Sequence, residues 1–246
     1  MNKNMKKVSC RRALFIFLSV LVMGIILSNV TVSIRVGEDG RYTIIKMPLY
    51  VKWTQFLARH YEYARIAKEA TAGCKTDEEK ALALLAWTRH NLKDTPAGMP
   101  IRDDHILNII IRGCGVPEQF QDVFTTLSSY SGMPAYWAKP YDLEHKTRYA
   151  VSFVKIGGKW RIFDAYRGAY FKNDKGVMAS VEDQMKEPVP LPGADAHGAS
   201  EVHYNDYFGD LGRMTRPWTT RPQRQMPLPR IVYEIRKAVG LEKDGE

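Results

Sequence analysis

The chain has 246 residues, of which 45% are hydrophobic, and this suits one globular domain with extensions. Its formal net charge of +9 lies at the two ends, because residues 1–12 carry five bases and no acid while residues 213–246 carry eight bases and four acids. The stretch 13–212 is therefore neutral, which argues against nucleic acid as a partner, since a nucleic-acid-binding domain usually carries a basic stripe on its folded body.

An uncharged apolar run follows the basic N-terminus. Residues 13–32, as a helix rising 1.5 Å per residue, would span about 30 Å, the thickness of a hydrocarbon core. We predict a transmembrane anchor over residues 13–33, since no Ala-x-Ala cleavage site follows, although a secretory signal peptide has the same layout. The positive-inside rule then places residues 1–12 in the cytoplasm and the remainder outside, at a bacterial inner membrane and facing the periplasm.

The three cysteines have different surroundings on this topology. Cys10 precedes the apolar run and would be cytoplasmic. Cys74 and Cys114 would both face an oxidising compartment, where thiols tend to pair. A Cys74–Cys114 disulfide is therefore one interpretation of Cys114, and the spacing in the sequence cannot decide whether the two Cα atoms come close enough.

A linker or hairpin and a long helix follow the anchor. Residues 34–48 indicate a hairpin that turns around residues 38–40 (Glu-Asp-Gly), and residues 49–72 form a predicted helix that Gly73 ends. The apolar residues of this helix recur at helical spacing: Trp53, Phe56, Leu57, Tyr61, Ala64 and Ile66.

Two further helices carry clear start signals. The pattern Thr-Asp-Glu-Glu from Thr76 to Glu79 is a capping box, and a Pro/Gly-rich loop over residues 94–104 follows this second helix. Pro117 suits the first position of a third helix, because the N–H that proline lacks would have no intrahelical partner there. This helix has one apolar face before Gly132 ends it: Phe120, Val123, Phe124 and Leu127.

Antiparallel strands follow the third helix. Residues 148–156 and 159–164 are predicted strands joined by a tight Gly157-Gly158 turn. A buried helix followed by antiparallel strands indicates an α+β fold, which we assign to residues 49–181. The Pro/Arg-rich residues 182–246 form a C-terminal extension that packs on the domain or extends from it, with a last short helix over residues 231–239.

Two motifs carry a family resemblance, namely Gly-Met-Pro-Ala at residues 132–135 and Gly-Lys-Trp-Arg-Ile-Phe-Asp at residues 158–164. With the helix before them they resemble the transglutaminase-like superfamily, relatives of papain-like cysteine enzymes, over roughly residues 76–171. The resemblance implies a buried helix packed on an antiparallel sheet, with a nucleophilic Cys at the helix N-terminus and a His and an Asp on neighbouring strands. The helix terminus lowers the pKa of such a thiol, the His takes its proton, and the Asp orients the His.

The chain departs from this pattern at two of the three positions. The family-aligned residues are Pro117, Tyr149 and Asp164, and only Asp164 keeps the expected type. Proline has no nucleophile, and tyrosine, with a reference pKa of about 10, is a poor base at neutral pH. The alternative set is Cys114, three residues before Pro117, with His145, four residues before Tyr149, and Asp164.

The sequence therefore predicts a membrane-anchored and catalytically degenerate module for envelope binding or assembly, more readily than an enzyme. Its partner would be the membrane together with a peptide, a glycan or a membrane protein. The alternative is an active thiol enzyme, a cysteine peptidase or acyl/amide transferase that uses Cys114, His145 and Asp164. A third hypothesis is a structural envelope protein whose basic tail binds an anionic polymer. No metal or cofactor is expected, because residues 103–105 (Asp-Asp-His) lack a second ligand cluster.

Overall fold

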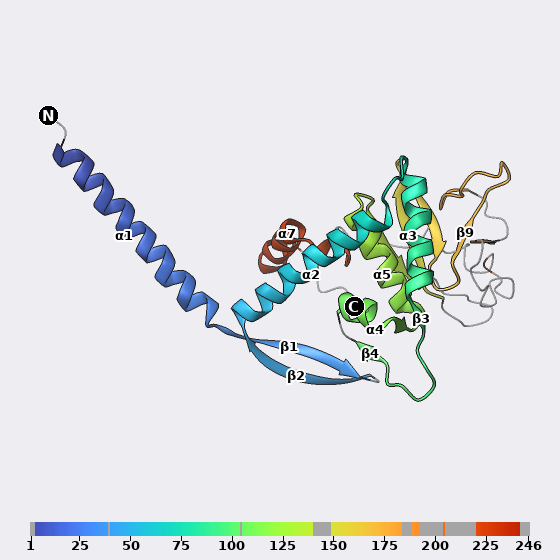
Figure 1. Ribbon diagram of the computed structural model, residues 1–246, viewed down its shortest axis with the longest axis horizontal. Helices are drawn as coiled ribbons and strands as arrows, with labels where there is room; N and C mark the ends of the chain where they lie inside the picture. The colour runs from blue at the N-terminus through green and yellow to red at the C-terminus, as the bar shows by residue number, and fades with distance from the viewer. Residues whose placement is uncertain are drawn as a thin grey trace.

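The computed structural model consists of a long N-terminal helix, a hairpin and a domain in which helices pack on a sheet (Figure 1). The residues that it describes are 3–38, 40–103, 105–139, 149–183, 188–191, 204 and 220–241. Within them, helices and antiparallel strands are mixed as the sequence predicts.

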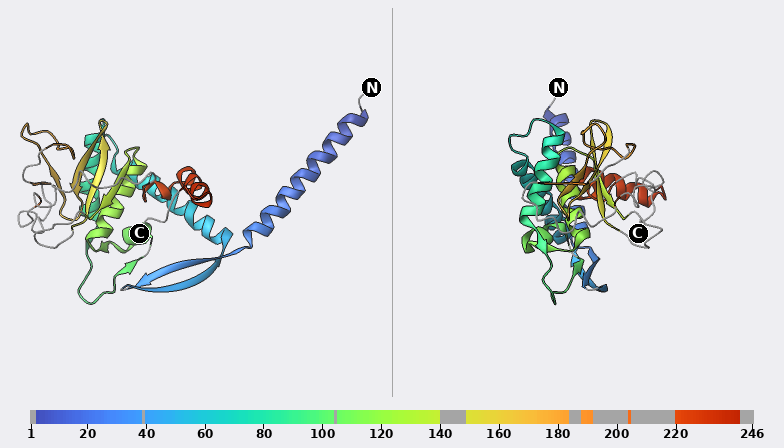
Figure 2. Two further views of the ribbon diagram at one scale, coloured as in Figure 1. Left: turned by 180° about the vertical axis from the view of Figure 1, so that it is seen from behind. Right: turned by 90° about the vertical axis from the view of Figure 1, so that its right-hand side faces the viewer.

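Helix α1 (Lys3–Ser28) leads directly into the hairpin of β1 (Thr31–Glu38) and β2 (Arg41–Pro48). The strands pair antiparallel from Thr31 opposite Pro48 to Glu38 opposite Arg41. Gly40 has a φ of 76°, a conformation that favours glycine, and it allows the tight turn expected there. Helix α1 extends away from the domain, whereas the hairpin runs back beneath the domain toward β4 (Arg102–Asp103) (Figure 2).

Among the described residues, a search for helices of sufficient length and hydropathy to cross a membrane finds none.

Four helices of the domain follow in chain order: α2 (Leu49–Ala70), α3 (Asp77–Asn91), α4 (Ile106–Arg112) and α5 (Pro117–Tyr130). The predicted capping box at the start of α3 is confirmed. The Glu79 backbone N–H donates to Thr76 Oγ1 at 3.1 Å, and the Thr76 N–H donates to Glu79 Oε2 at 3.2 Å. These two bonds satisfy backbone donors that a bare helix end would leave unpaired.

The predicted apolar face of α2 is wrong in its first half. The buried residues of α2 are Tyr63, Ile66 and Ala67, all in its second half, whereas Trp53 and Leu57 are exposed. The reason is tertiary, because only the second half of α2 packs on the domain and the first half continues outward to the hairpin (Figure 1). Helical spacing identified the helix but could not identify the part that is covered.

Five antiparallel strands form the main sheet in the order β10-β9-β8-β7-β6. Their bounds are β6 (Ala135–Ala138), β7 (Val151–Ile156), β8 (Lys159–Asp164), β9 (Ala169–Phe171) and β10 (Pro188–Pro190). The sequence predicted β7 and β8 with their Gly157-Gly158 turn, and it missed the other three strands, which have only three or four residues each. Short strands carry too little alternation to stand out.

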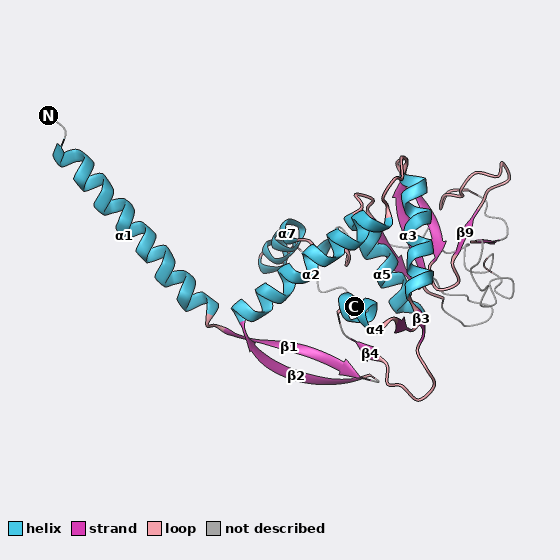
Figure 3. Cartoon of the chain, viewed as in Figure 1, coloured by secondary structure: helices cyan, strands magenta, loops and turns pink. Residues whose placement is uncertain are grey.

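Helix α5 is the centre of the core, with residues 119–129 all buried. The predicted apolar face of this helix lies inside, where Phe124 meets Phe163 of β8 with ring centroids 5.2 Å apart. Helices α2 and α3 contact α5 from one side and strands β6 and β7 from the other (Figure 3). A helix covered on several sides must also bury its polar residues, which places Gln121 and Asp122 in the core.

Short pairings complete the fold beside the start of α5. Strand β4 (Arg102–Asp103) extends the hairpin sheet by pairing with β1, and β3 (Lys93–Asp94) pairs in parallel with β5 (Cys114–Gly115). The β3–β5 pairing fixes the strand that leads into α5. It thereby sets the position of the helix N-terminus.

The C-terminal residues are tied to the core through Tyr130 at the end of α5. Its hydroxyl donates to the Gln225 carbonyl at 2.7 Å and lies 2.9 Å from His60 Nδ1, which therefore donates to it. Burial raises the pKa of Tyr130, so the hydroxyl remains a donor. Gln225 belongs to a 3₁₀ turn, η3 (Gln223–Gln225), that precedes α7 (Pro227–Ala238).

Replacing Tyr130 with Phe should lower the free energy of unfolding by about 1 kcal/mol, because His60 and the Gln225 carbonyl each lose a partner. Urea titration of the full chain in detergent measures this change. The matched control is Tyr61→Phe, since Tyr61 is 68% exposed and its hydroxyl should contribute almost nothing. Equal midpoints for the two variants would show that this contact does not hold the C-terminal residues.

Candidate functional site

The start of α5 is the position at which the resemblance places a nucleophile. Pro117 is its first residue, exposed to solvent, after Val116 as the N-cap. The Gln119 side chain turns back and accepts the Val116 N–H at 3.2 Å, while its Nε2 donates to the Arg102 carbonyl at 2.7 Å. The helix end is therefore capped by an amide and carries no nucleophile at its first residue.

Cys114 lies just before this helix, in β5. Its side chain is buried, with 8% of the residue exposed, and its Sγ is 3.9 Å from Met99 Sδ. Cys74 and Cys114 are both free thiols. The disulfide interpretation of Cys114 is therefore wrong, since the fold keeps the two sulfur atoms unbonded.

The alternative set of Cys114, His145 and Asp164 stays a prediction, because His145 lies outside the described residues. Its family-aligned counterpart Tyr149 is described and lies just before β7. The Tyr149 ring faces the guanidinium of Arg167, whose Cζ is 4.9 Å from the ring centroid. An arginine therefore lies between Tyr149 and Asp164.

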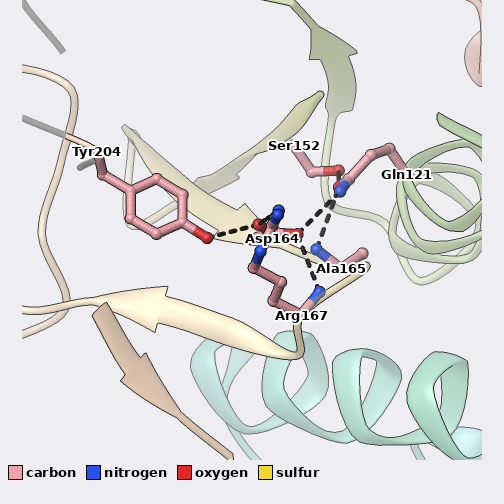
Figure 4. A network of polar contacts seen from close by, with 6 residues as sticks. All are labelled: Gln121, Ser152, Asp164, Ala165, Arg167 and Tyr204. Atoms are coloured by element: carbon pink, nitrogen blue, oxygen red, sulfur yellow. Dashed lines mark hydrogen bonds and ion pairs between the residues drawn. The ribbon is translucent and has the colours of Figure 1, made fainter. Parts of the chain in front are cut away.

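Asp164 ends β8 and is completely buried, and four donors surround its carboxylate (Figure 4). Oδ1 accepts the Arg167 backbone N–H at 3.0 Å and Gln121 Nε2 at 3.3 Å. Oδ2 accepts Arg167 Nη1 at 3.1 Å and the Tyr204 hydroxyl at 2.6 Å. Each carboxylate oxygen thus has two donors, so four hydrogen bonds hold the side chain in place.

Gln121 extends this network into the sheet. Its Oε1 accepts the Ser152 hydroxyl at 2.6 Å and the Ala165 N–H at 3.2 Å (Figure 4). The side chains of Gln121 and Ser152 are both completely buried. The network therefore joins α5, β7 and the turn after β8 within the interior, where satisfied polar groups fix a unique arrangement.

Charge balance explains why this network can be buried. Burial alone would lower the pKa of Arg167, but the charge and hydrogen bond of Asp164, together with Tyr204 and Tyr149, outweigh burial and raise the pKa of the guanidinium. For Tyr204, burial has the opposite effect and raises the pKa of the phenol. The neighbouring Asp164 charge raises this pKa further, so the phenol keeps its proton and donates.

A second buried carboxylate, Asp122, lies next to Gln121 on α5. Its Oδ1 accepts the indole N–H of Trp137 at 2.7 Å, and its Oδ2 pairs with Arg221 Nη1 at 3.4 Å. Tyr204 and Arg221 both come from the C-terminal extension. That extension therefore supplies a partner to each of the two buried carboxylates.

Sequence reasoning identified Asp164 and missed the residues that surround it. Gln121 and Asp122 gave one usable signal, since two adjacent polar residues on a helix buried on several sides require partners. Arg167 gave a second, because it follows Asp164 by three residues. Nothing local indicated Tyr204, which lies forty residues from Asp164 along the chain.

No group of three or more His, Cys, Asp or Glu side chains suited to a metal ion is found among the described residues.

Residues 64–165 match the family model described as the transglutaminase-like superfamily. The resemblance is therefore confirmed over the stretch that holds Cys114, Pro117, Tyr149 and Asp164. No curated protein matches the chain.

Two solved structures resemble the chain. One, a candidate cysteine protease from Cytophaga hutchinsonii, is 22% identical with a TM-score of 0.38, over 48% of this chain and 40% of that one. The other, a candidate protease from Parabacteroides distasonis, is 14% identical with a TM-score of 0.36, over 66% of this chain and 41% of that one. The chain thus spans about two fifths of each solved protein, and scores this low carry no inference about activity.

Replacing Arg167 with Met should lower the free energy of unfolding by about 3–5 kcal/mol, because it leaves a buried carboxylate without its cation. The double variant Arg167→Met/Asp164→Asn should recover part of that loss, since the uncompensated charge is gone. Chemical denaturation of four proteins, namely the wild type, Arg167→Met, Asp164→Asn and the double variant, measures the coupling.

The matched control is Arg65→Met. Arg65 also contacts two carboxylates, Glu62 and Glu69, but it is exposed, so its loss should change the free energy of unfolding far less than the loss of Arg167. Equal costs for the Arg167 and Arg65 variants would contradict the structural role of the Asp164–Arg167 pair.

Proposed function

We propose that the transglutaminase-like core of this chain is a non-catalytic module for binding or assembly at a membrane of the cell envelope. The observation that carries the proposal is the saturated carboxylate of Asp164, with two donors on each oxygen. In a cysteine–histidine–aspartate triad the aspartate must accept the imidazole N–H and fix its tautomer. Here Arg167 and Tyr204 already donate to the carboxylate oxygen that would accept this N–H.

Replacing these partners with an imidazole would be costly. The Arg167 guanidinium is largely buried and would lose its counter-ion, which is an expensive change in a low-dielectric interior. At the other end of the site, Pro117 has the backbone suited to a helix start and no nucleophilic atom. Both differences from the family pattern thus favour a fixed structure over acid–base chemistry.

The surface beside this site suits a ligand with flat or apolar groups. Tyr149 and Tyr166 are half-buried and both lie against the Arg167 guanidinium, at 4.9 and 5.5 Å from the ring centroids. Tyr166 also packs edge-on to Phe120 in the first turn of α5, with centroids 5.2 Å apart. Two anchored aromatic rings near a helix N-terminus fit a peptide or a glycan, which bind by stacking and by a few hydrogen bonds.

Anchoring by α1 completes the proposal. The large apolar side chains between Leu14 and Leu27 are 47–72% exposed around the helix, and no charged residue lies among them. A helix that is apolar on every side is expected either in a core or in a membrane. The domain would then lie on the side opposite the basic residues 1–12, facing the periplasm of a bacterial inner membrane.

A thiol enzyme, either a cysteine peptidase or an acyl/amide transferase, is the second candidate function. The observation in its favour is that Cys114 is a free thiol three residues before the start of α5. Its catalytic set would be Cys114, His145 and Asp164. The burial of Cys114 against Met99 opposes access to substrate.

Iodoacetamide labelling distinguishes the two functions. In the native full-length chain Cys114 should label more slowly than Cys74 between pH 6 and pH 9, because Cys74 is partly exposed and Cys114 is buried. Peptide mass spectrometry resolves the two sites, and denatured chain should show equal rates. In the variant Pro117→Cys the introduced thiol should label fastest, because it is exposed at a helix N-terminus that stabilises a thiolate.

Labelling of Cys114 ahead of Cys74 at pH 6 would overturn the non-catalytic proposal. Turnover of a thioester-forming substrate that Cys114→Ala abolishes would do the same and would establish the enzyme.

A further inference from the structure

The helix α7 exposes an apolar stripe. Four large side chains on it and its C-cap Val239 are 45–75% exposed; the four are Leu228, Ile231, Val232 and Ile235. Their spacing of i, i+3, i+4, i+7 and i+11 places them on one face of the helix. A continuous exposed face of this kind on a short helix marks a contact with something apolar.

This stripe is not the face by which α7 is held. The buried residue of α7 is Tyr233, and the guanidinium groups of Arg224 and Arg230 lie 4.6 and 5.8 Å from its ring centroid. At 100° per residue, Tyr233 lies well over a quarter turn from every member of the stripe except Val232. The helix is therefore attached by one side and presents its apolar side outward.

Helix α2 has a comparable exposed stripe from Tyr50 to Tyr61, mostly in its first half. Four side chains at i, i+3, i+7 and i+11 are exposed there: Tyr50, Trp53, Leu57 and Tyr61. Tyrosine and tryptophan are enriched where membrane meets water, because each ring has an apolar body and a polar edge. Both α7 and the first half of α2 lie on the side of the domain nearest to α1 (Figures 1 and 2).

The charges around α7 complement an anionic surface. Residues 220–241 contain five bases and one acid, for a net charge of +4. Arg236 and Lys237 lie in the last turn of α7, Arg236 beside the stripe and Lys237 on the opposite side of the helix. An amphipathic helix with an apolar face and a cationic polar face lies in the interface of a bilayer, where anionic headgroups attract its bases.

We propose that α7 is a second membrane contact, lying in the surface of an anionic bilayer with its stripe among the acyl chains and the α2 stripe at headgroup level. This rests on the proposed anchoring by α1. The two contacts together would fix the orientation of the domain on the membrane. A second copy of the chain is a poorer occupant, because a symmetric interface would bring two segments of charge +4 together.

Photo-crosslinking identifies the occupant directly. We would place p-benzoylphenylalanine at Ile235 of the full-length chain and reconstitute it in phosphatidylcholine vesicles with and without phosphatidylglycerol. The matched control is the same probe at Ile111 of α4, which is 74% exposed but outside both stripes. The lipid adduct at position 235 should exceed that at position 111, and it should increase with phosphatidylglycerol and fall at high salt.

A separate variant tests how much the bases of α7 contribute to the membrane contact. Replacing Arg236 and Lys237 with Gln should lower the adduct at position 235 in the anionic vesicles by about fivefold per charge, from ~1 kcal/mol for each base near such a surface. An adduct to a second chain, or equal lipid adducts at positions 235 and 111, would overturn the proposal.

Flotation and alkaline carbonate extraction separate this inference from the anchor. Carbonate-resistant chain without the lipid adduct refutes α7 as a contact and leaves the anchor intact. Carbonate-extractable chain that floats and shows the adduct refutes the anchor alone. Chain that does not float with vesicles of either composition refutes both.

Discussion

The buried ion pair of Asp164 and Arg167 is the constraint on which the rest of the domain depends. A carboxylate with no exposed surface is tolerated only when it is paired and hydrogen-bonded. Its partners come from α5, from the turn after β8 and from the C-terminal extension, so these three segments must be placed together. Ser152 of β7 joins through Gln121. Packing of the apolar core alone would tolerate small shifts of these elements, whereas the network allows one arrangement.

The same logic makes the described C-terminal residues part of the core. Tyr204 donates to Asp164, Arg221 pairs with Asp122, and the Gln225 carbonyl accepts from Tyr130. Each contact gives a polar group of the interior a further partner, beside those that the domain itself supplies. Tyr204, Arg221 and Gln225 are therefore required by the interior, even though they belong to a segment whose composition is that of a Pro/Arg-rich tail. The Tyr130–Gln225 contact also fixes the position at which α7 starts, because Gln225 belongs to η3, the turn directly before this helix.

The sequence was sufficient wherever the signal was local. The Thr76 capping box, the start of α5 at Pro117 and the Gly157-Gly158 hairpin each depend on a few adjacent residues, and all three formed as predicted. The covered half of α2 was not predictable, because it is decided by the helices and strands that pack there. The partners of Asp164 were missed for the same reason, since Gln121 and Tyr204 are 43 and 40 residues away. The resemblance supplied the position of Asp164 but not its surroundings.

A working active site usually departs from the rules of local stability, because it keeps an acceptor unsaturated or a nucleophile exposed. The two positions that differ from the family pattern here, Pro117 and Tyr149, follow those rules instead. Proline is the residue that a helix start accommodates with least loss. Tyr149 lies against Arg167, which gives Asp164 the counter-ion that a neutral imidazole would not. Stability gained at such positions generally comes at the expense of activity. That exchange is the physical argument behind the proposal that this site is structural and that its aromatic surroundings bind a ligand.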